Sequence, residues 1–344
     1  MASGITLGLL GCLFGLGAVL YLVVVPWTLK SVSTYSSSTT VTATPGAPTG
    51  SAAVPDLDSM NDYLTRLMWV AGLTFTAVSL IFLVAAYGSI FLKRWSRPLA
   101  IFLSGSWLYI GLVYMASLVI FSGPMQQDMR EQMAEAGAGA PSGSQMFGII
   151  MVVGMAFIFV FGIALPALIL WLNWHRDVAL TLEYADRKPR WTDRCPIPIL
   201  CLVFACILIA VFTGTSPFLG ALPLFGHIFV GSSIYVIWAV IALALFGIAW
   251  GLYRLKITAW AALVVLVVAG IVSTILTTLN ADYQVIYEQM GMPEELIDQS
   301  LNSIQGTWQS PRSIIIMLVS ALPILGYLIW CFRFFRPASN SAIG

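Results

Sequence analysis

Charged residues are scarce in this chain. Asp, Glu, Lys and Arg make up 9% of its 344 residues, and hydrophobic residues make up 59%. Soluble proteins carry about 25% charged and roughly 45–50% apolar residues, so a water-soluble protein is excluded. The apolar residues form long uninterrupted blocks rather than the alternating pattern of a membrane β-barrel. Blocks of about 20 apolar residues cross the hydrocarbon layer as helices, and the composition therefore predicts an all-α membrane protein.

Eight apolar blocks are predicted to span the membrane, and none of them contains Asp, Glu, Lys or Arg. This absence argues against ion-coupled transport, because such transporters keep ionisable groups inside the membrane to bind the coupling ion. Facilitated movement of a neutral or apolar solute stays open. The predicted spans are 5–25, 67–92, 99–122, 147–174, 197–216, 228–253, 257–279 and 313–332.

Catalytic and metal-binding patterns are also missing. The chain has no Gly-x-Ser-x-Gly elbow, no His-Glu-x-x-His and no paired acids within a span, so we expect no enzyme, no catalytic residue and no cofactor. His175 and His227 are predicted on opposite sides of the membrane, where they cannot share a metal. A polar cluster around His175 and Asp193 would be needed to support an enzyme. The five cysteines contain no Cys-x-x-Cys pair and no disulfide framework.

Basic residues are distributed unevenly between alternate loops. One set of loops holds 12 of the 16 Lys and Arg residues, and the other holds 11 of the 15 acids. Because loops rich in Lys and Arg stay on the cytoplasmic side, both termini are predicted to be cytoplasmic. The 12 residues are Lys93, Arg94, Arg97, Arg176, Arg187, Lys188, Arg190, Arg194, Arg254, Lys256, Arg333 and Arg336.

Two tripeptides recur at the same separation. Glu131-Gln132-Met133 returns as Glu288-Gln289-Met290, and Ala164-Leu165-Pro166 returns as Ala321-Leu322-Pro323, both after 157 residues. The order of spans and loop charges also agrees between the halves, which indicates a duplication.

A further correspondence precedes the short basic turns. Gly88 and Leu92-Lys93 match Gly251 and Leu255-Lys256. Four spans per copy is an even number, so both copies enter the membrane in the same direction. They are therefore predicted to be related by a pseudo-two-fold axis along the membrane normal.

The predicted domains correspond to this duplication. The first four-helix repeat covers 1–178, a cytoplasmic linker 179–196, the second repeat 197–336 and a tail 337–344. Outer loop 31–54 is rich in Ser, Thr, Pro and Gly and is predicted to be disordered. Segments 124–146 and 280–312 are predicted to be outer helices that lie against the membrane or cap the bundle. Region 214–226 is predicted to be either a turn or a re-entrant dip.

The first outer segment carries a stripe of methionines. Met125, Met129 and Met133 recur every four residues, which places them on one helix face. Thioethers suit Cu(I), but the matching segment has Tyr283, Tyr287 and Met290 instead. The stripe therefore favours packing over copper, and no metal is predicted.

Two kinds of residue are candidates for a role within the bundle. Pro166 and Pro323 occupy matching positions in helices and would free backbone groups there, as at the binding sites of transporter repeats; ordinary kinks are the alternative. Pairs of glycines four residues apart allow helices to approach closely. These pairs are Gly4 with Gly8, Gly11 with Gly15, and Gly247 with Gly251.

The linker Arg190-Trp191-Thr192-Asp193-Arg194-Cys195-Pro196, joined to the duplicated Ala-Leu-Pro helices, resembles uncharacterised bacterial multi-pass membrane proteins with tandem four-helix repeats. The resemblance extends over most of the chain. It implies a location in the bacterial cytoplasmic membrane and carries no known activity.

These observations favour a non-enzymatic scaffold or accessory subunit of a membrane assembly. Its expected partners are the lipid bilayer and other membrane subunits, with no nucleic acid. The alternative is a carrier or channel for a small neutral or lipid-like solute, built on the repeat.

Overall fold

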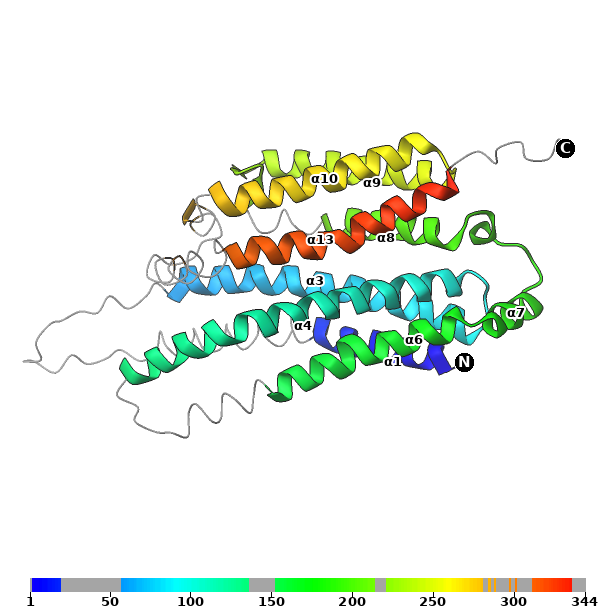
Figure 1. Cartoon of the computed structure of the whole chain (residues 1–344), viewed down its shortest axis with the longest axis horizontal. Helices are drawn as coiled ribbons and strands as arrows, with labels where there is room; N and C mark the ends of the chain where they lie inside the picture. The colour runs from blue at the N-terminus through cyan, green and yellow to red at the C-terminus, as the bar shows by residue number, and fades with distance from the viewer. Residues whose placement is uncertain are drawn as a thin grey trace, which may run out of the picture. The chain divides into compact units, whose positions relative to one another are not determined.

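The computed structural model of this chain is mostly helical (Figure 1). It describes residues 2–19, 57–135, 152–213, 221–280, 284–285, 288, 297, 301 and 311–335. The predicted outer loop 31–54, the tail 337–344 and most of the outer segment 280–312 lie outside the described residues. The contacts within the chain group it into two compact units. Unit 1 contains Met1–Ile5 and Ala85–Ile197, and unit 2 contains Thr6–Val84 and Pro198–Gly344.

Six helices are long and apolar enough to cross a membrane, and each overlaps a predicted span. This confirms a multi-pass helical membrane protein. The other two predicted spans correspond to α1 (Ala2–Val19) and to α8 (Ile197–Thr213), an apolar helix of 17 residues. The six helices contain Met68–Ile90, Ser96–Phe121, Val152–Trp174, Ser233–Tyr253, Ile257–Asn280 and Ser313–Phe334.

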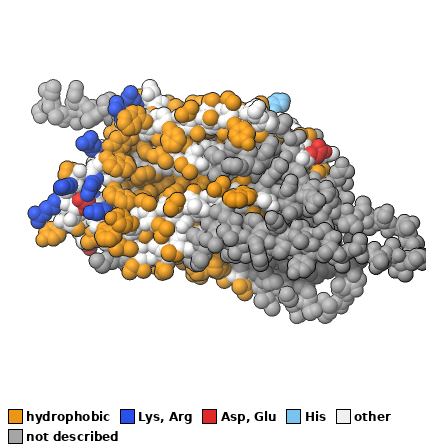
Figure 2. Space-filling model, turned by 180° about the vertical axis from the view of Figure 1, so that it is seen from behind, with side chains coloured by type: hydrophobic (Ala, Val, Ile, Leu, Met, Phe, Trp, Pro, Cys, Tyr) orange, Lys and Arg blue, Asp and Glu red, His pale blue; other side chains and the backbone are white. Residues whose placement is uncertain are grey.

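Apolar side chains dominate the visible helix surfaces in the space-filling view (Figure 2). Large exposed residues such as Phe157, Leu243 and Ile329 are at least 61% exposed. In water such surface would be unfavourable by about 25 cal/mol per Å², whereas a bilayer solvates it. The surface is therefore that of a protein dissolved in lipid.

Unit 1 is built around α4 (Ser96–Glu135), which packs along the π-helical turn η2 (Phe159–Ala164) and along α6 (Leu165–Trp174). In η2 the amide of Leu165 donates to the carbonyl of Val160, five residues back. This shift leaves the carbonyl of Phe161 unused by the helix, and the indole Nε1 of Trp107 donates to it at 3.0 Å. Lipid offers no donor for a free carbonyl, so Trp107 supplies what the π turn removes.

A single helix replaces the separate outer helix predicted after residue 124. Helix α4 runs without a break from Ser96 to Glu135, which is 40 residues, or about 60 Å at 1.5 Å per residue. The residues after the candidate span Ser96–Phe121 are rich in Gln, Met, Glu and Ala, which favour helix, and the helix therefore continues beyond that span. Residues 136–151 lie outside the described part.

Unit 2 packs α9 (Ser233–Tyr253) on α10 (Ile257–Asn280), and α10 on α13 (Pro311–Cys331), which ends in the short helix η5 (Phe332–Phe334). Side-chain hydrogen bonds to backbone carbonyls connect helices distant in sequence. Trp260 Nε1 donates to Leu328 at 2.9 Å, and the Tyr327 hydroxyl donates to Pro198 at 2.9 Å.

Within unit 2, a side-chain hydrogen bond joins α1 to α3 (Leu57–Ile90). The Ser79 hydroxyl donates to the carbonyl of Gly11 at 2.7 Å. This bond gives the hydroxyl an acceptor inside a helix pair, as polar residues between membrane helices require.

A β-hairpin interrupts the predicted all-α architecture. Strand β1 (Ala221–Leu224) pairs antiparallel with β2 (His227–Val230). The two turn residues, Phe225 and Gly226, have φ of 50° and 80°, as a type I′ turn requires. The predicted span 228–253 therefore starts too early, since α9 begins at Ser233. Apolar strand residues resemble the start of a membrane helix in hydropathy, which explains the error.

The hairpin turn is fastened to α10. The amides of Phe225 and Gly226 donate to the hydroxyls of Ser273 and Thr277, at 3.0 and 3.3 Å. These hydroxyls lie four residues apart on one helix face. Region 214–226 therefore ends in a turn that lies against the last two turns of α10, and residues 214–220 are outside the described part.

Helix α3 ends in a left-handed cap. Leu92 has a φ of 52°, and the amides of Lys93 and Leu92 donate to the carbonyls of Gly88 and Ser89 at 2.7 and 3.4 Å, the pattern of a Schellman motif. A Cβ on Gly88 would lie 2.7 Å from the Cβ of Ser96. Glycine at this position therefore allows α4 to fold back closely on α3.

Helix α9 ends in the same way within unit 2. Leu255 has a φ of 53°, and the amides of Lys256 and Leu255 donate to the carbonyls of Gly251 and Leu252 at 3.0 and 2.8 Å. A Cβ on Gly251 would lie 2.5 Å from the Cβ of Ala259. Each cap bond here has a counterpart in the cap of α3.

Candidate functional site

A cleft of about 320 Å³ opens at the basic end of unit 1. It lies among the turn after α3, the first turn of α4, helix α7 (Arg176–Ala185) and the 3₁₀-helix η3 (Trp191–Arg194). Both α7 and η3 lie in or beside the segment predicted as a linker. The lining residues are Arg94, Arg97, Pro98, Ala179, Leu182, Glu183, Thr192, Asp193, Cys195, Pro196 and Ile197.

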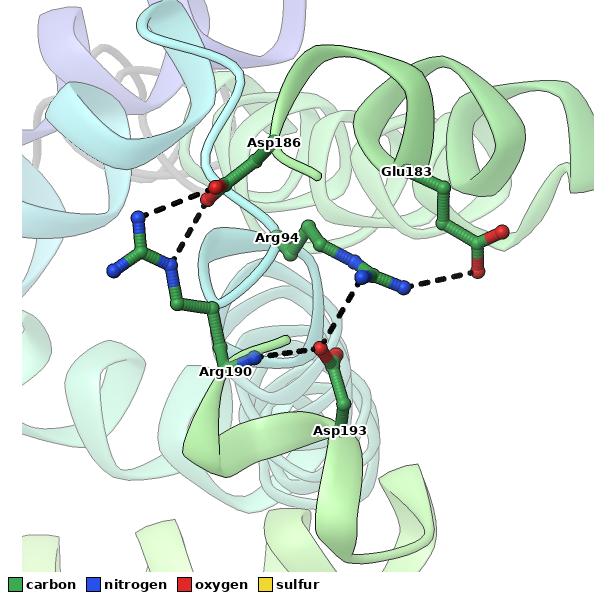
Figure 3. Close-up of polar contacts among 5 residues, drawn as sticks. All are labelled: Arg94, Glu183, Asp186, Arg190 and Asp193. Carbon is green, nitrogen blue, oxygen red and sulfur yellow. Dashed lines mark hydrogen bonds and ion pairs between the residues drawn. The ribbon is translucent and has the colours of Figure 1, made fainter. Parts of the chain in front are cut away.

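Local hydrogen bonds hold the loop from Asp186 to Asp193 beside the cleft. The amide of Arg190 donates to Asp193 Oδ2 at 2.8 Å, which caps η3. The guanidinium of Arg190 reaches back to Asp186, with Nε to Oδ2 at 3.0 Å and Nη2 to Oδ1 at 3.2 Å (Figure 3). This two-bonded geometry fixes the loop between α7 and η3. The Arg190 guanidinium holds the pKa of the Asp186 carboxyl below its usual value.

Arg94 connects the three elements around the cleft. Its side chain extends from the turn after α3 and lies 3.4 Å from a Glu183 carboxylate oxygen on α7 and 3.5 Å from Asp193 Oδ2 on η3 (Figure 3). The Arg94 side chain is 21% exposed, whereas those of Glu183 and Asp193 are 56% and 32% exposed. Pairs this open to solvent contribute about 1 kcal/mol or less, so their role is chiefly to position α7 and η3.

Arg97 lies at the membrane edge of the cleft, in the first turn of α4. Its Nε donates to the carbonyl of Asn173 near the end of α6 at 3.1 Å. The Asn173 amide in turn donates to the carbonyl of Ile169 at 2.8 Å. Arg97 therefore ties α4 to α6 through its Nε. Its guanidinium also interacts electrostatically with Glu183, although no carboxylate of the described residues forms an ion pair with it within 4 Å.

Two uncharged polar groups in the cleft are buried. Thr192 is 4% exposed, and its hydroxyl has no hydrogen-bond partner in the described part of the chain. Cys195 is 5% exposed. Burial raises the pKa of the Cys195 thiol to about 11, so this thiol stays protonated at neutral pH.

Neither histidine is among the residues that line this cleft. His175, between α6 and α7, is exposed and packs edge-on against Trp171 at 5.0 Å. His227 lies exposed on β2 in unit 2. Among the described residues, no three His, Cys, Asp or Glu side chains group closely enough to hold a metal ion. Asp193 is in the cleft, and its nearest charged partner is Arg94 rather than a histidine.

The predicted proline pair occupies two different environments. Pro166 is buried and lies in the first turn of α6, directly after the π turn. Pro323 is exposed inside the continuous helix α13. The two residues therefore interrupt their helices differently.

The predicted glycine pairs also separate into distinct groups. Gly4, Gly11 and Gly251 each face a close neighbour, since an added Cβ would lie within 3.0 Å of Ile90, Leu83 and Ala259 respectively. Gly8 is half-buried in α1, and the surroundings of Gly15 lie outside the described part. Around Gly247 no described atom lies within 4 Å of an added Cβ.

Sequence reasoning misses the cleft because its residues come from three separate segments. The motif from Arg190 to Pro196 supplies Thr192, Asp193 and Cys195 to one wall. Arg94 and Arg97 also line the cleft. In the sequence alone, these two basic residues indicate only the orientation of the protein in the membrane.

Comparisons with known protein families, with characterised proteins and with solved structures found no significant match to this chain.

Proposed function

We propose that this protein is a non-enzymatic scaffold or accessory subunit of a larger membrane assembly. The observation that carries the proposal is a set of glycines on uncovered faces of unit 2. Gly247 on α9, Gly270 on α10 and Gly326 on α13 have no described atom within 4 Å of an added Cβ, and all three are exposed.

The presence of glycine at exposed positions inside these helices has to be explained. A lipid-facing helix surface accepts side chains of any size, and glycine costs about 1 kcal/mol relative to alanine inside a helix. Small residues are favoured where another helix approaches closely. Partner helices packed against these three faces would account for them.

Covered and uncovered glycines provide a matched test. Gly247→Leu, Gly270→Leu and Gly326→Leu are expected to leave the isolated protein folded while removing any stoichiometric partner that co-purifies in mild detergent. Gly251→Leu serves as the control, because its side chain would collide with Ala259 in the same chain and lower stability directly. A clean monomer from native membranes, or a partner retained by all three variants, would contradict the scaffold.

We further propose that the protein has eight membrane spans, arranged as two parallel four-helix repeats. The matching caps of α3 and α9 support the duplication, since both place a leucine in the left-handed region after the same glycine. Non-glycine residues rarely adopt this conformation, so two copies at corresponding positions favour common descent. A pair of side-chain hydrogen bonds gives further support. Arg97 donates to a backbone carbonyl of α6, and Trp260, at the corresponding position, donates to a backbone carbonyl of α13.

The proposed orientation places the basic turns in the cytoplasm of a bacterium. Single cysteines introduced into a cysteine-free chain test it at two exposed sites, Lys188→Cys and His227→Cys. A membrane-impermeant maleimide added to intact cells is expected to label the second site only. Labelling of Lys188→Cys alone would indicate the opposite orientation. Labelling of both variants would indicate a different number of spans.

A carrier or channel for a small neutral or lipid-like solute is the less supported alternative. Its main support would be a symmetric pair of interrupted helices. The exposed Pro323 in an unbroken α13 weakens that support, whereas the buried Pro166 after a π turn preserves it for one half.

A further inference from the structure

The cleft of unit 1 contains more hydrogen-bond donors than its own residues use. Arg97 hydrogen-bonds through its Nε and interacts electrostatically with Glu183, which leaves the terminal nitrogens of its guanidinium able to donate hydrogen bonds. The buried hydroxyl of Thr192 has no partner at all there. Leaving a buried hydroxyl unsatisfied costs roughly 1–3 kcal/mol, and native proteins leave few such groups without a reason.

One oxygen of each of the two carboxylates in the cleft lies against Arg94. Asp193 Oδ2 receives the amide of Arg190 and faces Arg94, and Glu183 also pairs with Arg94. Because Arg94 is paired with these carboxylates, the donors that remain in the cleft are the Arg97 guanidinium and the Thr192 hydroxyl. Together they match a negatively charged ligand rich in acceptor oxygens. Guanidinium groups bind phosphate with particular geometric fit.

The position of the cleft narrows the choice of ligand. Arg97 and Pro98 belong to the first turn of the span Ser96–Phe121, at the level where lipid phosphates meet the protein. Basic pockets at the cytoplasmic ends of membrane helices are a known setting for anionic head groups. A volume of about 320 Å³ holds a phosphate with its esterified alcohol.

The second half of the chain lacks these donors. At the cap of α9, Ile257 and Trp260 stand where Arg94 and Arg97 stand after α3. Because the same backbone turn forms with an apolar pair, the two arginines are not needed to make the turn. Arg94 is accounted for by its ion pairs with Glu183 and Asp193. Arg97 makes the same kind of bond as Trp260, so its positive charge is not needed for that bond.

We propose that this cleft binds a phosphate ester, held by the Arg97 guanidinium and the Thr192 hydroxyl. The ester comes from a phospholipid head group or from a soluble phosphorylated molecule, since both present the same oxygens. The site is independent of the scaffold role, because its residues lie in unit 1, whereas the three exposed glycines that carry the scaffold proposal lie in unit 2.

The lipid source is tested by native mass spectrometry of the full chain. Protein purified and delipidated in a neutral detergent is mixed with phosphatidylglycerol or with digalactosyl diacylglycerol, which has no phosphate. Wild type is expected to retain phosphatidylglycerol selectively, and Arg97→Trp to weaken retention at least about ten-fold. Lys188→Trp removes the same charge from an exposed position outside the cleft and is expected to behave as wild type.

The soluble source is tested with the same proteins by thermal unfolding. Inorganic phosphate and glycerol 3-phosphate are added at millimolar concentration, with chloride at equal ionic strength as the reference. An increase in Tm that disappears in Arg97→Trp, without selective retention of phosphatidylglycerol, would identify a soluble phosphate ester.

Thr192→Val keeps the test decisive if Arg97→Trp does not fold. Valine has the shape of threonine without its hydroxyl, so the ligand-free variant is expected to unfold about 2 °C or more above wild type, while phosphate affinity falls about ten-fold. A variant that gains no stability and binds phosphatidylglycerol, phosphate and glycerol phosphate as wild type does would overturn the proposal. Failure of all three ligands to bind wild type would also overturn it.

Discussion

The turn from Tyr87 to Arg97 and the turn from Trp250 to Trp260 share a backbone and differ in chemistry. Both close with the same pair of cap bonds and a leucine at φ near 50°. In both, the side chain four residues after an aromatic ring packs on that ring, as Phe91 on Tyr87 at 4.6 Å and Arg254 on Trp250 at 4.7 Å.

The residues after the cap distinguish the two turns. Arg94 of the first turn reaches Glu183 and Asp193 and holds α7 and η3 around a cleft. Ile257, at the corresponding position of the second turn, is uncharged and cannot form ion pairs. Glycine and leucine therefore make both turns, while the two arginines line a cleft at the first turn only.

The largest expected effect comes from filling the glycines of the two caps. Gly251→Ala and Gly88→Ala are each expected to lower the free energy of unfolding in detergent by about 1–3 kcal/mol. The loss at Gly251 should be greater, because the new Cβ meets the Ala259 Cβ at 2.5 Å, whereas at Gly88 part of the collision is with the Trp95 ring.

Two further variants control this experiment. Adding Ala259→Gly to Gly251→Ala is expected to restore most of the lost stability. Gly247→Ala, with no described atom within 4 Å of the new Cβ, should be neutral or slightly stabilising. If Gly251→Ala and Gly247→Ala have the same free energy of unfolding, α9 and α10 do not approach each other closely at Gly251.

The left-handed leucines give the next largest effect. Leu92→Gly and Leu255→Gly are each expected to be about 1 kcal/mol more stable than the matching alanine variant, because glycine adopts positive φ without the steric cost of a Cβ. Thermal unfolding of the four variants measures the difference. Equal values at one turn and not at the other would show that the two caps are not equivalent.

Exchanging the chemistry of the turns has a smaller and more local effect. Arg94→Ile, which copies the second turn, is expected to change global stability by about 1 kcal/mol or less. Amide hydrogen exchange in α7 should nevertheless rise, since the ion pairs with Glu183 and Asp193 are lost. Lys188→Ile removes the same charge elsewhere and should leave α7 unchanged. Undisturbed exchange in Arg94→Ile would mean that α7 is positioned by other contacts.

The smallest effect is the acid response of the loop after α7. Because Arg190 lowers the pKa of Asp186 below its ordinary value, ionisation of Asp186 favours the folded loop. That contribution is complete above about pH 4 and disappears as the pH falls through the lowered pKa.

Hydrogen exchange of residues 186–194, corrected for intrinsic rates, should therefore accelerate below pH 4 in wild type. Asp186→Asn should reduce this pH dependence, and the carboxylate of Asp193 accounts for any part that is left. Residues 250–260 contain no carboxylate and provide an internal reference, which should show no such change. Identical acid profiles for wild type and Asp186→Asn would refute the assignment.

Much of the helical framework could be predicted because membrane spans are set by hydropathy and length, which are local. All six long apolar helices fall within predicted spans extended by a few residues. The repeat of Gly88 and Leu92 at Gly251 and Leu255 also located both helix turns, although it did not reveal the left-handed leucines. Their conformation is forced by the close return of the next helix, a contact that no local pattern contains.

Features that depend on distant partners could not be predicted. The turn Phe225-Gly226 lacks the usual Asn-Gly signal of a type I′ hairpin, and its hydroxyl partners on α10 are about 50 residues further on. The orphan hydroxyl of Thr192 likewise results from burial among the walls of the cleft rather than from its own motif. Hydropathy also cannot separate the continuous α4 from a span and a separate outer helix.

The hydroxyls that receive the hairpin turn also impose an order on biosynthesis. Phe225 leaves the ribosome 48 residues before Ser273, so the two turn amides have no intramolecular acceptor when the hairpin first reaches the membrane. An unpaired amide is costly in hydrocarbon. The turn amides therefore gain their protein acceptors only after α10 has been synthesised, and water is their available partner until then.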